Sequence, residues 1–452
     1  MRFSELEGAR VGVWGAGREV TSFAAQAARR LPGARIAVAA FDSTPDAVAL
    51  SALAPFAPLV LDAADAVAGL AGCEVIVRSP GVSVYRRELV ELRERGLHVT
   101  TPTSLWLCEH GAERVVGVTG TKGKSTTAAL LAQLARAAGL SVELAGNIGV
   151  PALDLLDSPE PQLTVLELSS YQLADLACGP EVALVTNVYR EHTEWHGSEQ
   201  AYRADKLRIL GLPGLRAAVL NGRDEALVAA RAEVPVTLFG VDGGWNVDGD
   251  RLVRAGEPRA EISQLPLKGV HNALNLCGAL ATLETAGISV ADPAAALSGF
   301  RPLAHRLEEL TSDGPALWVN DSISTTPESA VAALESYADR PLVLIAGGQD
   351  RGQDYDVLAG VVARAGAQLI GVPSTGPRLL EAARAAGVEP SHIHHCEDLA
   401  DAVRTASGLA GEGAVVLLSP AAPSYDRFRD FEERGETFRR LVGEAGGKAA
   451  SR

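Results

Sequence analysis

One pattern recurs along almost the whole chain: a short run of Val, Leu, Ile and Ala, then a glycine-containing turn, then a longer alanine-rich segment. Strands that alternate with helices in this way are typical of α/β domains with mainly parallel sheets. The 452 residues are enough for about two or three such domains. We expect an α/β protein with three domains, at residues 1–101, 102–301 and 302–452.

The charge and hydropathy of the chain argue against several partners. Its formal net charge is −15 at pH 7, and an acidic surface repels nucleic acids and anionic membranes. No apolar run approaches the ~20 residues of a membrane span, and the N-terminus lacks the basic and apolar regions of a signal peptide. We expect a cytoplasmic monomer with no nucleic-acid or membrane partner.

The cysteines favour a reduced protein. Their number is odd and no pair has the CxxC spacing, so we expect neither a disulfide framework nor a zinc site. The five residues are Cys73, Cys108, Cys178, Cys277 and Cys396. We interpret them as buried thiols of a cytosolic protein.

The strongest functional motif is a glycine-rich loop between an expected strand at 115–119 and an expected helix at 125–138. It reads Gly120, Thr121, Lys122, Gly123, Lys124, Ser125, Thr126. A strict phosphate loop has glycine where this chain has Val118,. The physical parts are nevertheless present, because the glycines let backbone N–H groups surround phosphate oxygens and the helix N-terminus favours an anion. Lys124 is expected to reach the terminal phosphates, and Ser125 to bind Mg²⁺.

A second glycine turn follows the first expected strand. Gly15, Ala16 and Gly17 resemble a dinucleotide fingerprint without its third glycine, and Asp42 ends the next strand,. This pattern is equally compatible with an NAD site and with a Rossmann-like turn that binds another ligand, and both interpretations stay open.

Candidate metal ligands follow two further strands. Glu167 directly follows an expected strand at 163–166, and His192 follows another at 182–185, within Glu-His-x-x-x-His. Ligands bind beyond the carboxyl ends of parallel strands, so both side chains are expected on the side of the phosphate loop, where they could hold metal ions between phosphates. His196 is a weaker candidate. The local sequence alone predicts that Lys206 is a solvated lysine on an amphipathic helix.

Taken together and in order, these motifs resemble the Mur ligases of peptidoglycan assembly, over nearly the whole chain. The further motifs that carry the resemblance are Gly146-Asn147-Ile148-Gly149, Glu167-Leu-Ser-Ser, Glu191-His192, Lys206, His271-Asn272-Ala-Leu-Asn275, His305-Arg306, Asn320-Asp321-Ser322, Ser419-Pro420-Ala421 and Phe431-Glu-Glu-Arg-Gly-Glu-Thr-Phe438. The glutamate-adding branch, which extends UDP-N-acetylmuramoyl-L-alanine, is the most similar.

The resemblance implies the fold and the ligands of each domain. A Rossmann-like first domain would bind the UDP substrate, a central phosphate-loop domain would bind ATP, and a Rossmann-like third domain would bind the amino acid. The UDP-substrate residues would be Gly15, Ala16, Gly17, Asp42, Ser79, Pro80, Gly81, Asn147 and Ser169. The ATP residues would be 120–126, Asn272, Asn275, Arg306 and Asp321. The glutamate residues would be Thr325, Arg351, Ser424, Tyr425 and Phe431.

The resemblance also implies a mechanism. The substrate's carboxylate would be phosphorylated by ATP, and the resulting acyl phosphate would be attacked by the amine of glutamate, while Lys124 and two Mg²⁺ ions neutralise the phosphate oxygens. Ser125 and Glu167 would hold one Mg²⁺, and His192 would hold the second. Lys206 would be a metal ligand as a carbamate, which turns an ammonium into an anionic oxygen ligand. Asn147 would contact the substrate near the reacting group.

Four positions depart from the family pattern. Lys122 and Glu191 replace residues that many relatives have as asparagine and aspartate, and both keep the chemistry intact. Ile323 stands where D-glutamate enzymes usually have lysine, and Arg351 lies where they usually have Gly-Lys. The last two indicate a rarer branch that adds L-glutamate.

Other functions are weighed against this prediction. Addition of D-glutamate is the alternative within the branch. A folate-polyglutamate ligase lacks the N-terminal Rossmann-like domain, and a non-enzymatic NAD-binding regulator would leave Lys124, Glu167 and His192 without a role.

Overall fold

The computed structural model describes residues 1–42, 47–189, 191, 193–266, 269–301, 304–310 and 314–449. By their contacts these residues form two compact units. Unit 1 comprises Met1–Leu265 and Asn272–Phe300, and unit 2 comprises Pro266–His271 and Arg301–Arg452.

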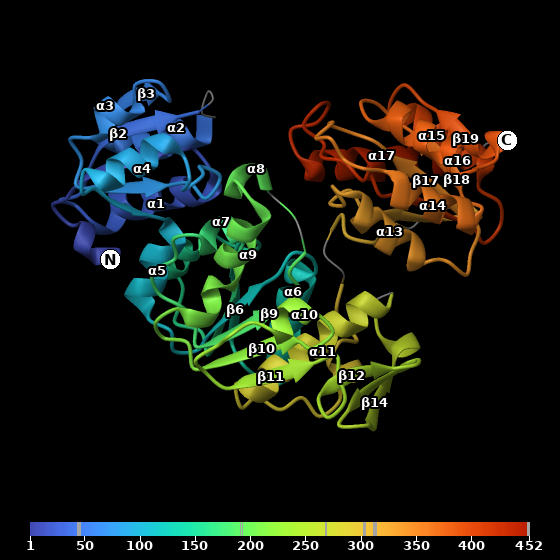
Figure 1. Ribbon diagram of the computed structural model, residues 1–452, viewed down its shortest axis with the longest axis horizontal. Coiled ribbons are helices and arrows are strands. Elements are labelled where there is room, and N and C mark those ends of the chain that lie inside the picture. The colour runs from blue at the N-terminus through green and yellow to red at the C-terminus, as the bar shows by residue number, and fades with distance from the viewer. Residues whose placement is uncertain are drawn as a thin grey trace. The chain divides into compact units, whose positions relative to one another are not determined.

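The first sheet of unit 1 is parallel throughout, in the order β3-β2-β1-β4-β5. It lies in the blue part of the ribbon in Figure 1. Its strands are β1 Arg10–Trp14, β2 Arg35–Phe41, β3 Leu59–Asp62, β4 Val75–Arg78 and β5 His98–Thr100. The connecting helices are α1 Arg18–Arg30, α2 Ala47–Leu53, α3 Ala66–Leu70 and α4 Arg87–Glu94. Val11, Val13 and Trp14 of β1 are fully buried, as expected for a central strand covered by helices on both faces.

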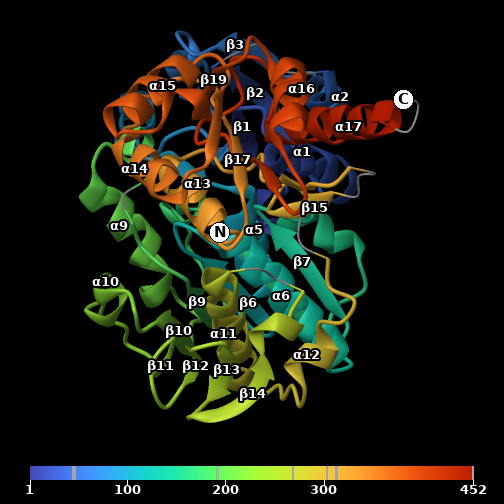
Figure 2. The ribbon, with the colours of Figure 1, turned by 90° about the vertical axis from the view of Figure 1, so that its right-hand side faces the viewer.

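The second sheet of unit 1 is also parallel, in the order β11-β10-β9-β6-β8-β7. Its strands are β6 Val115–Thr119, β7 Val142–Gly146, β8 Leu163–Glu167, β9 Val182–Val185, β10 Ala217–Asn221 and β11 Val236–Phe239. Its helices are α5 Pro102–His110, α6 Lys124–Ala137, α7 Ser170–Leu173, α8 Thr193–His196, α9 Glu199–Leu207, α10 Glu225–Val228, α11 Val270–Thr285 and α12 Pro293–Ala296. Helix α6 packs along β6, β7 and β8, and Figure 2 shows this helix beside β7. A small antiparallel sheet of β12 Trp245–Asp248, β13 Arg251–Arg254 and β14 Glu257–Glu261 follows.

A buried polar interface joins the two parallel sheets of unit 1. Arg78 has no exposed side-chain surface and forms two hydrogen bonds with the carboxylate of Asp175, at 2.9 and 2.5 Å. Its remaining N–H groups donate to the carbonyls of Tyr171, Ser79, Pro80 and Val82. Glu19, also buried, accepts from Thr103 and Gln172. Paired charges of this kind fix one arrangement, because separating them would leave buried charge without a partner.

The described residues of unit 2 form one sheet, in the order β15-β16-β20-β17-β18-β19, parallel except for β15. The strands are β15 Glu308–Leu310, β16 Leu317–Asn320, β17 Leu342–Ala346, β18 Gln368–Gly371, β19 Ile393–His395 and β20 Val415–Leu418. The helices are α13 Pro327–Glu335, α14 Asp356–Ala365, α15 Gly376–Ala385, α16 Leu399–Leu409 and α17 Phe431–Ala449. The α/β class with parallel sheets is thereby confirmed, whereas the boundary at 101/102 within unit 1 stays a prediction.

The interpretation of all five cysteines as free thiols is wrong, because Cys108 and Cys178 form a disulfide with a Cα–Cα distance of 5.4 Å. Sequence spacing could not reveal this pair, since the fold brings together residues 70 positions apart. In the described part of the chain, no helix is long and apolar enough to cross a membrane.

Candidate active site

The glycine-rich loop leaves β6 and enters helix α6 through two backbone positions that require glycine. Gly120 has φ 148° and Gly123 has φ 81°. A Cβ on Gly120 would lie 1.9 Å from Thr186 Oγ1, and one on Gly123 would lie 2.5 Å from Asn275 Oδ1. Both the left-handed backbone and the close neighbours exclude a side chain here. The loop therefore packs against β9 on one side and against α11 on the other.

Hydrogen bonds from neighbouring segments fix the shape of this loop. Thr121 N donates to Asn187 O at 2.8 Å, and Lys122 N donates to Asn187 Oδ1 at 2.7 Å. The Thr121 hydroxyl lies 2.6 Å from the hydroxyl of Tyr202. Ser125 and Thr126 are buried in the first turn of α6. A preorganised loop at the N-terminus of a 14-residue helix suits an anionic phosphate chain.

Three lysine side chains surround the loop. Lys124 Nζ donates to Thr121 O at 2.9 Å, and Lys122 Nζ forms an ion pair with Glu191 Oε1 at 2.6 Å. Lys206 is 1% exposed, and its Nζ lies 2.8 Å from Gly120 O. Burial, followed by the nearby charge of Lys124, holds the pKa of Lys206 well below its ordinary value. The solvated-helix interpretation of Lys206 is therefore wrong.

Glu167 is a buried carboxylate at the end of β8. It has no exposed surface, and its Oε1 accepts a hydrogen bond from Asn147 Nδ2 at 2.9 Å. Among the residues that the structure describes, no hydrogen-bond partner reaches its Oε2. A buried carboxylate oxygen without a donor is costly, and a cation would satisfy it. The Glu167 carboxylate is therefore the kind of oxygen ligand that Mg²⁺ prefers, whereas the amine of Lys206 fits such a site only as a carbamate.

The other predicted residues of this site lie on α11, at the start of α7 and outside the described residues. Asn275 Nδ2 donates to Asn272 Oδ1 at 3.3 Å, so both amides lie at the start of α11. Ser169 forms the N-cap of α7 and exchanges hydrogen bonds with Gln172, so its hydroxyl stabilises the start of this helix. His192 lies outside the described residues.

The predicted substrate turns of the first sheet lie close together. A Cβ on Gly15 would lie 2.7 Å from Ser79 Cβ, and one on Gly17 would lie 2.7 Å from Ser79 Oγ. The Gly15–Gly17 turn therefore faces the segment of Ser79, Pro80 and Gly81. Asp42 accepts from Trp14 Nε1 at 3.3 Å and from Arg86 Nη1 at 2.5 Å.

One arginine links this first sheet to the loop that carries Asn147. Arg18 Nη2 donates to the carbonyls of Gly146 and Gly149, at 3.3 and 3.0 Å. Sequence reasoning missed this residue, although it directly follows the Gly15–Gly17 turn.

Unit 2 holds a second group of predicted residues around Asp321. This carboxylate is 3% exposed and accepts from Ser419 Oγ at 2.8 Å and from Leu307 N at 3.2 Å. Burial raises its pKa to about 6, although hydroxyl hydrogen bonds and the charge of Arg306 oppose the shift. Asp321 thereby anchors the segment next to Arg306.

The residues predicted to bind the amino acid lie around the turn that follows β20. The guanidinium of the exposed Arg351 lies 5.8 Å from the centre of the Tyr425 ring, within cation–π range. Ser424 is buried, and Phe431 O accepts from Ser322 Oγ at 2.8 Å. Thr325 and Ile323 are half-buried after β16.

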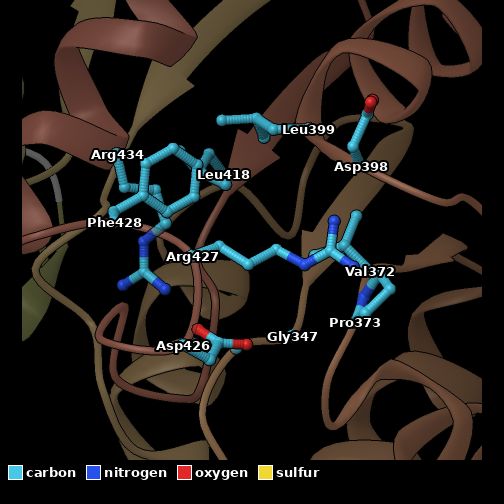
Figure 3. A pocket seen from close by; sticks show the side chains of 11 residues that line it. Gly347, Val372, Pro373, Asp398, Leu399, Leu418, Asp426, Arg427, Phe428 and Arg434 are labelled. Atoms are coloured by element: carbon cyan, nitrogen blue, oxygen red, sulfur yellow. The ribbon is translucent and has the colours of Figure 1, made fainter.

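A cavity of about 360 Å³ opens beside these residues, and Figure 3 shows the side chains that line it. Arg434, one of them, is 3% exposed, and its guanidinium donates to Ser322 Oγ, Ser322 O and Ala422 O. Within the described residues it forms no ion pair, and burial lowers its pKa to about 10. Sequence reasoning missed this buried cation, although it lies within the quoted run 431–438.

The chain is similar to known proteins along its whole length. Residues 118–283 match the Mur ligase middle domain, and residues 305–422 match the Mur ligase glutamate ligase domain. The UDP-N-acetylmuramoyl-L-alanine–L-glutamate ligase of a Micromonospora species is 43% identical over 100% of both chains. The enzyme of the same name from Salinispora tropica is 42% identical over 99% of this chain and 100% of its own.

A solved structure shares the fold. The UDP-N-acetylmuramate–alanine ligase of Thermotoga maritima superposes with a TM-score of 0.61 at 17% identity, over 98% of this chain and 100% of its own. At that identity the likeness concerns the fold alone.

Proposed function

Because this chain belongs to the Mur ligase family, we propose that it is an ATP-dependent ligase that joins L-glutamate to UDP-N-acetylmuramoyl-L-alanine in peptidoglycan precursor synthesis. The observation that carries the proposal is the full-length similarity, at 42–43% identity, to enzymes named for this reaction. The geometry of unit 1 supports the use of ATP, because a glycine loop, a helix N-terminus and three lysines converge there.

ATP would lie along the loop 120–126. Its β- and γ-phosphates would face the N-terminus of α6 and Lys124, while Asn272 and Asn275 would flank the adenine. Arg306 and Asp321 are the further ATP residues that the family resemblance implies. A cationic side chain at the terminal phosphate stabilises the charge that spreads over the γ-oxygens as the phosphoryl group moves.

Two Mg²⁺ ions would be held by Ser125, Glu167, His192 and Lys206. The buried Glu167 Oε2, which no described donor reaches, supports this ligand set. When bound, Mg²⁺ neutralises phosphate oxygens and aligns the transferred group. Asn147 would fix the Glu167 carboxylate through its 2.9 Å hydrogen bond and would itself face the reacting carboxylate.

Lys206 would act as a carbamate. The lowered pKa of its amine supports this role, because only a neutral amine attacks CO₂. The nitrogen lone pair forms the N–C bond, one proton leaves to solvent, and the lysine becomes an anionic oxygen ligand. A buried ammonium would repel the metal, whereas the carbamate attracts it.

The reaction then follows from the chemistry of carboxylates. The alanine carboxylate oxygen attacks the γ-phosphorus of ATP, ADP leaves, and an acyl phosphate with a good leaving group forms. The amine of glutamate, after losing a proton, attacks the acyl carbon. The tetrahedral intermediate collapses to the amide and inorganic phosphate.

The two other substrates would occupy the remaining groups of residues. The UDP part would lie between the Gly15–Gly17 turn and Ser79, Pro80 and Gly81, with Asp42 at the uracil. Glutamate would lie near Thr325, Arg351, Ser424, Tyr425 and Phe431. The neighbouring cavity carries Arg427 and Arg434, two cations that suit an amino acid with two carboxylates.

Phosphate release tests the proposal. It should require ATP, UDP-N-acetylmuramoyl-L-alanine and glutamate together, with one dipeptidyl product per phosphate by mass spectrometry. Release that ignores the muramoyl acceptor, or product formation without ATP, would contradict the proposed function.

A further inference from the structure

Helix α9 presents one buried face that carries Lys206. Tyr202, Asp205 and Lys206 are spaced i, i+3 and i+4 and are 0%, 7% and 1% exposed, so they lie on the same side of the helix. The helix has only nine residues, and helices this short are marginal by themselves. The direction in which Lys206 points therefore depends on contacts of this face with the rest of unit 1.

His196, at the end of α8, contacts both neighbours of Lys206 on that face. It is 1% exposed, and its ring packs edge-on against Tyr202, with 5.2 Å between ring centres. Its Nδ1 lies 2.6 Å from Asp205 Oδ2. Because a carboxylate only accepts, Nδ1 carries the proton and donates it.

The other ring nitrogen of His196 reaches the segment that carries Glu167. His196 Nε2 lies 3.0 Å from Ser170 Oγ, and Ser170 begins α7 three residues after Glu167. His196 thus bridges the helix of one candidate metal ligand to the turn of another.

Asp205 has a further partner from the first sheet of unit 1. The hydroxyl of Tyr85, in the segment between β4 and α4, lies 3.0 Å from both Asp205 oxygens. The carboxylate is therefore held from two directions, and rotation of α9 about its axis would break both contacts.

The order Ser170, His196, Asp205 resembles a nucleophilic triad, but burial excludes that role. Ser170 is 3% and His196 1% exposed, so no substrate carbonyl can reach the hydroxyl. A group that carries a hydrogen-bonded link between two metal-ligand segments acts instead by orienting them.

We propose that His196 is a positioning residue, which sets the orientation of helix α9 through Asp205 and Ser170 so that Lys206 and Glu167 both face the proposed two-metal site. This inference rests on the metal site of the proposed function. Loss of an outer-shell partner of this kind typically weakens metal binding or activity roughly 10–100-fold.

An isosteric pair of variants separates hydrogen bonding from packing. His196→Asn keeps an N–H near the place of Nδ1, whereas His196→Leu has the same shape without a donor. The measurement is Mn²⁺ binding to the full-length protein in the presence of ADP. The electron paramagnetic resonance signal of free Mn²⁺ gives its dissociation constant independently of turnover. We expect His196→Leu, which loses both contacts, to weaken Mn²⁺ binding about tenfold or more. His196→Asn keeps the contact with Asp205 and loses only the one with Ser170, so it should weaken Mn²⁺ binding only several-fold.

Two further variants keep the test decisive if His196→Leu does not fold. Ser170→Ala removes only a hydroxyl and should weaken Mn²⁺ binding several-fold, and the double variant should be no worse than His196→Leu, because both act through one link. His110→Leu is the matched control, since His110 stacks on Trp106 at the end of α5 and contacts no residue of this network. It should bind Mn²⁺ as the wild type does.

The outcomes distinguish the two proposals. If the wild-type protein shows no ATP-dependent ligation, the proposed function itself is wrong. A wild type that ligates and binds Mn²⁺, with unchanged Mn²⁺ affinity in folded His196→Leu or Ser170→Ala, would overturn only the positioning role.

Discussion

Lys206 Nζ lies 2.8 Å from the carbonyl oxygen of Gly120, so the buried amine of helix α9 directly contacts the glycine-rich loop. Gly120 itself can take no side chain, because Thr186 occupies the space. The contact places one more nitrogen beside the proposed phosphate site. Burial and Lys124 lower the pKa of that amine, which favours the neutral, nucleophilic form.

Lys206→Ala should abolish most ligase activity, because the proposed carbamate ligand is lost. Short-chain carboxylates such as acetate or propionate should restore part of the activity by supplying the missing anion. The measurement is ATP-dependent phosphate release at increasing carboxylate concentration, with Lys206→Arg as a charged variant that cannot form the carbamate. Ordinary activity in Lys206→Ala would contradict the metal-ligand role.

Lys124→Ala should lower kcat by on the order of 10²–10³-fold, the usual loss when one group that stabilises transition-state charge is removed. The melting temperature should stay near that of the wild type, since the side chain is only partly buried. Lys122→Asn, in the same loop, is the control. Its ion pair with Glu191 is part-exposed, and such pairs contribute little, so activity should fall less than about tenfold.

Much of unit 1 could be predicted from the sequence because strand ends determine where a ligand binds. The expected strands at 115–119 and 182–185 coincide with β6 and β9, and the expected helix at 125–138 differs from α6 by one residue at each end. Since β6 lies between β8 and β9, Glu167 and the loop necessarily meet at one edge of the sheet.

Contacts between distant segments could not be predicted in this way. Nothing in the run around Asp205 indicates that Tyr85, 120 positions away, donates to it. The burial of Arg434 could not be predicted either, because an arginine within a charged run is expected to be exposed to solvent. Tertiary packing decides both cases, and hydrophobic periodicity carries no information about which polar side chains it encloses.

Asp321→Asn should change the pH dependence of stability in a defined direction. The pKa of Asp321 rises from 3.8 in the reference state to about 6 in the fold, so the folded state binds more protons between these values. The contribution of this group to stability is full below the lower value and is lost as the pH rises through about 6, a difference of about 3 kcal/mol.

Urea unfolding of both proteins at about pH 5 and about pH 7.5 measures the effect. Between these conditions the wild type should lose about 1 kcal/mol relative to Asp321→Asn, which has no carboxyl to titrate. A constant difference between the two proteins would mean that Asp321 is ionised throughout.

UDP-N-acetylmuramoyl-L-alanine should bind in the absence of ATP, and NAD should not bind. Asp42→Ala should weaken the UDP ligand in calorimetric titrations, whereas Asp62→Ala, at the end of the edge strand β3, should not. Tight NAD binding that depends on Asp42 would instead support a dinucleotide site at Gly15–Gly17.

The structure around Arg351 leads to a prediction about the glutamate site. Arg351→Ala should raise the KM for glutamate about 10–100-fold, the cost of a lost charge-assisted hydrogen bond, and should leave the KM for ATP unchanged. Arg404→Ala on α16, whose side chain is 69% exposed, is the control. An equal rise in both KM values would indicate a general defect of unit 2.

The added amino acid should be L-glutamate. Two enantiomers with the same amine position must direct their carboxylates differently. An enzyme that uses the other enantiomer must therefore place the cationic residue that binds the carboxylate at another position. Here Ile323 is an apolar, half-buried residue after β16, and the guanidinium of Arg351 stands over Tyr425 instead. Arginine holds a carboxylate through two parallel hydrogen bonds, which fixes its orientation as well as its charge. A polar site that leaves a buried charge unpaired can reject the wrong ligand on the order of 10⁴-fold. With UDP-N-acetylmuramoyl-L-alanine and ATP held constant, kcat/KM should therefore be far higher for L-glutamate than for D-glutamate, and chiral analysis of the product should recover the L form. A clear preference for D-glutamate would make this prediction wrong and leave a D-glutamate ligase in its place.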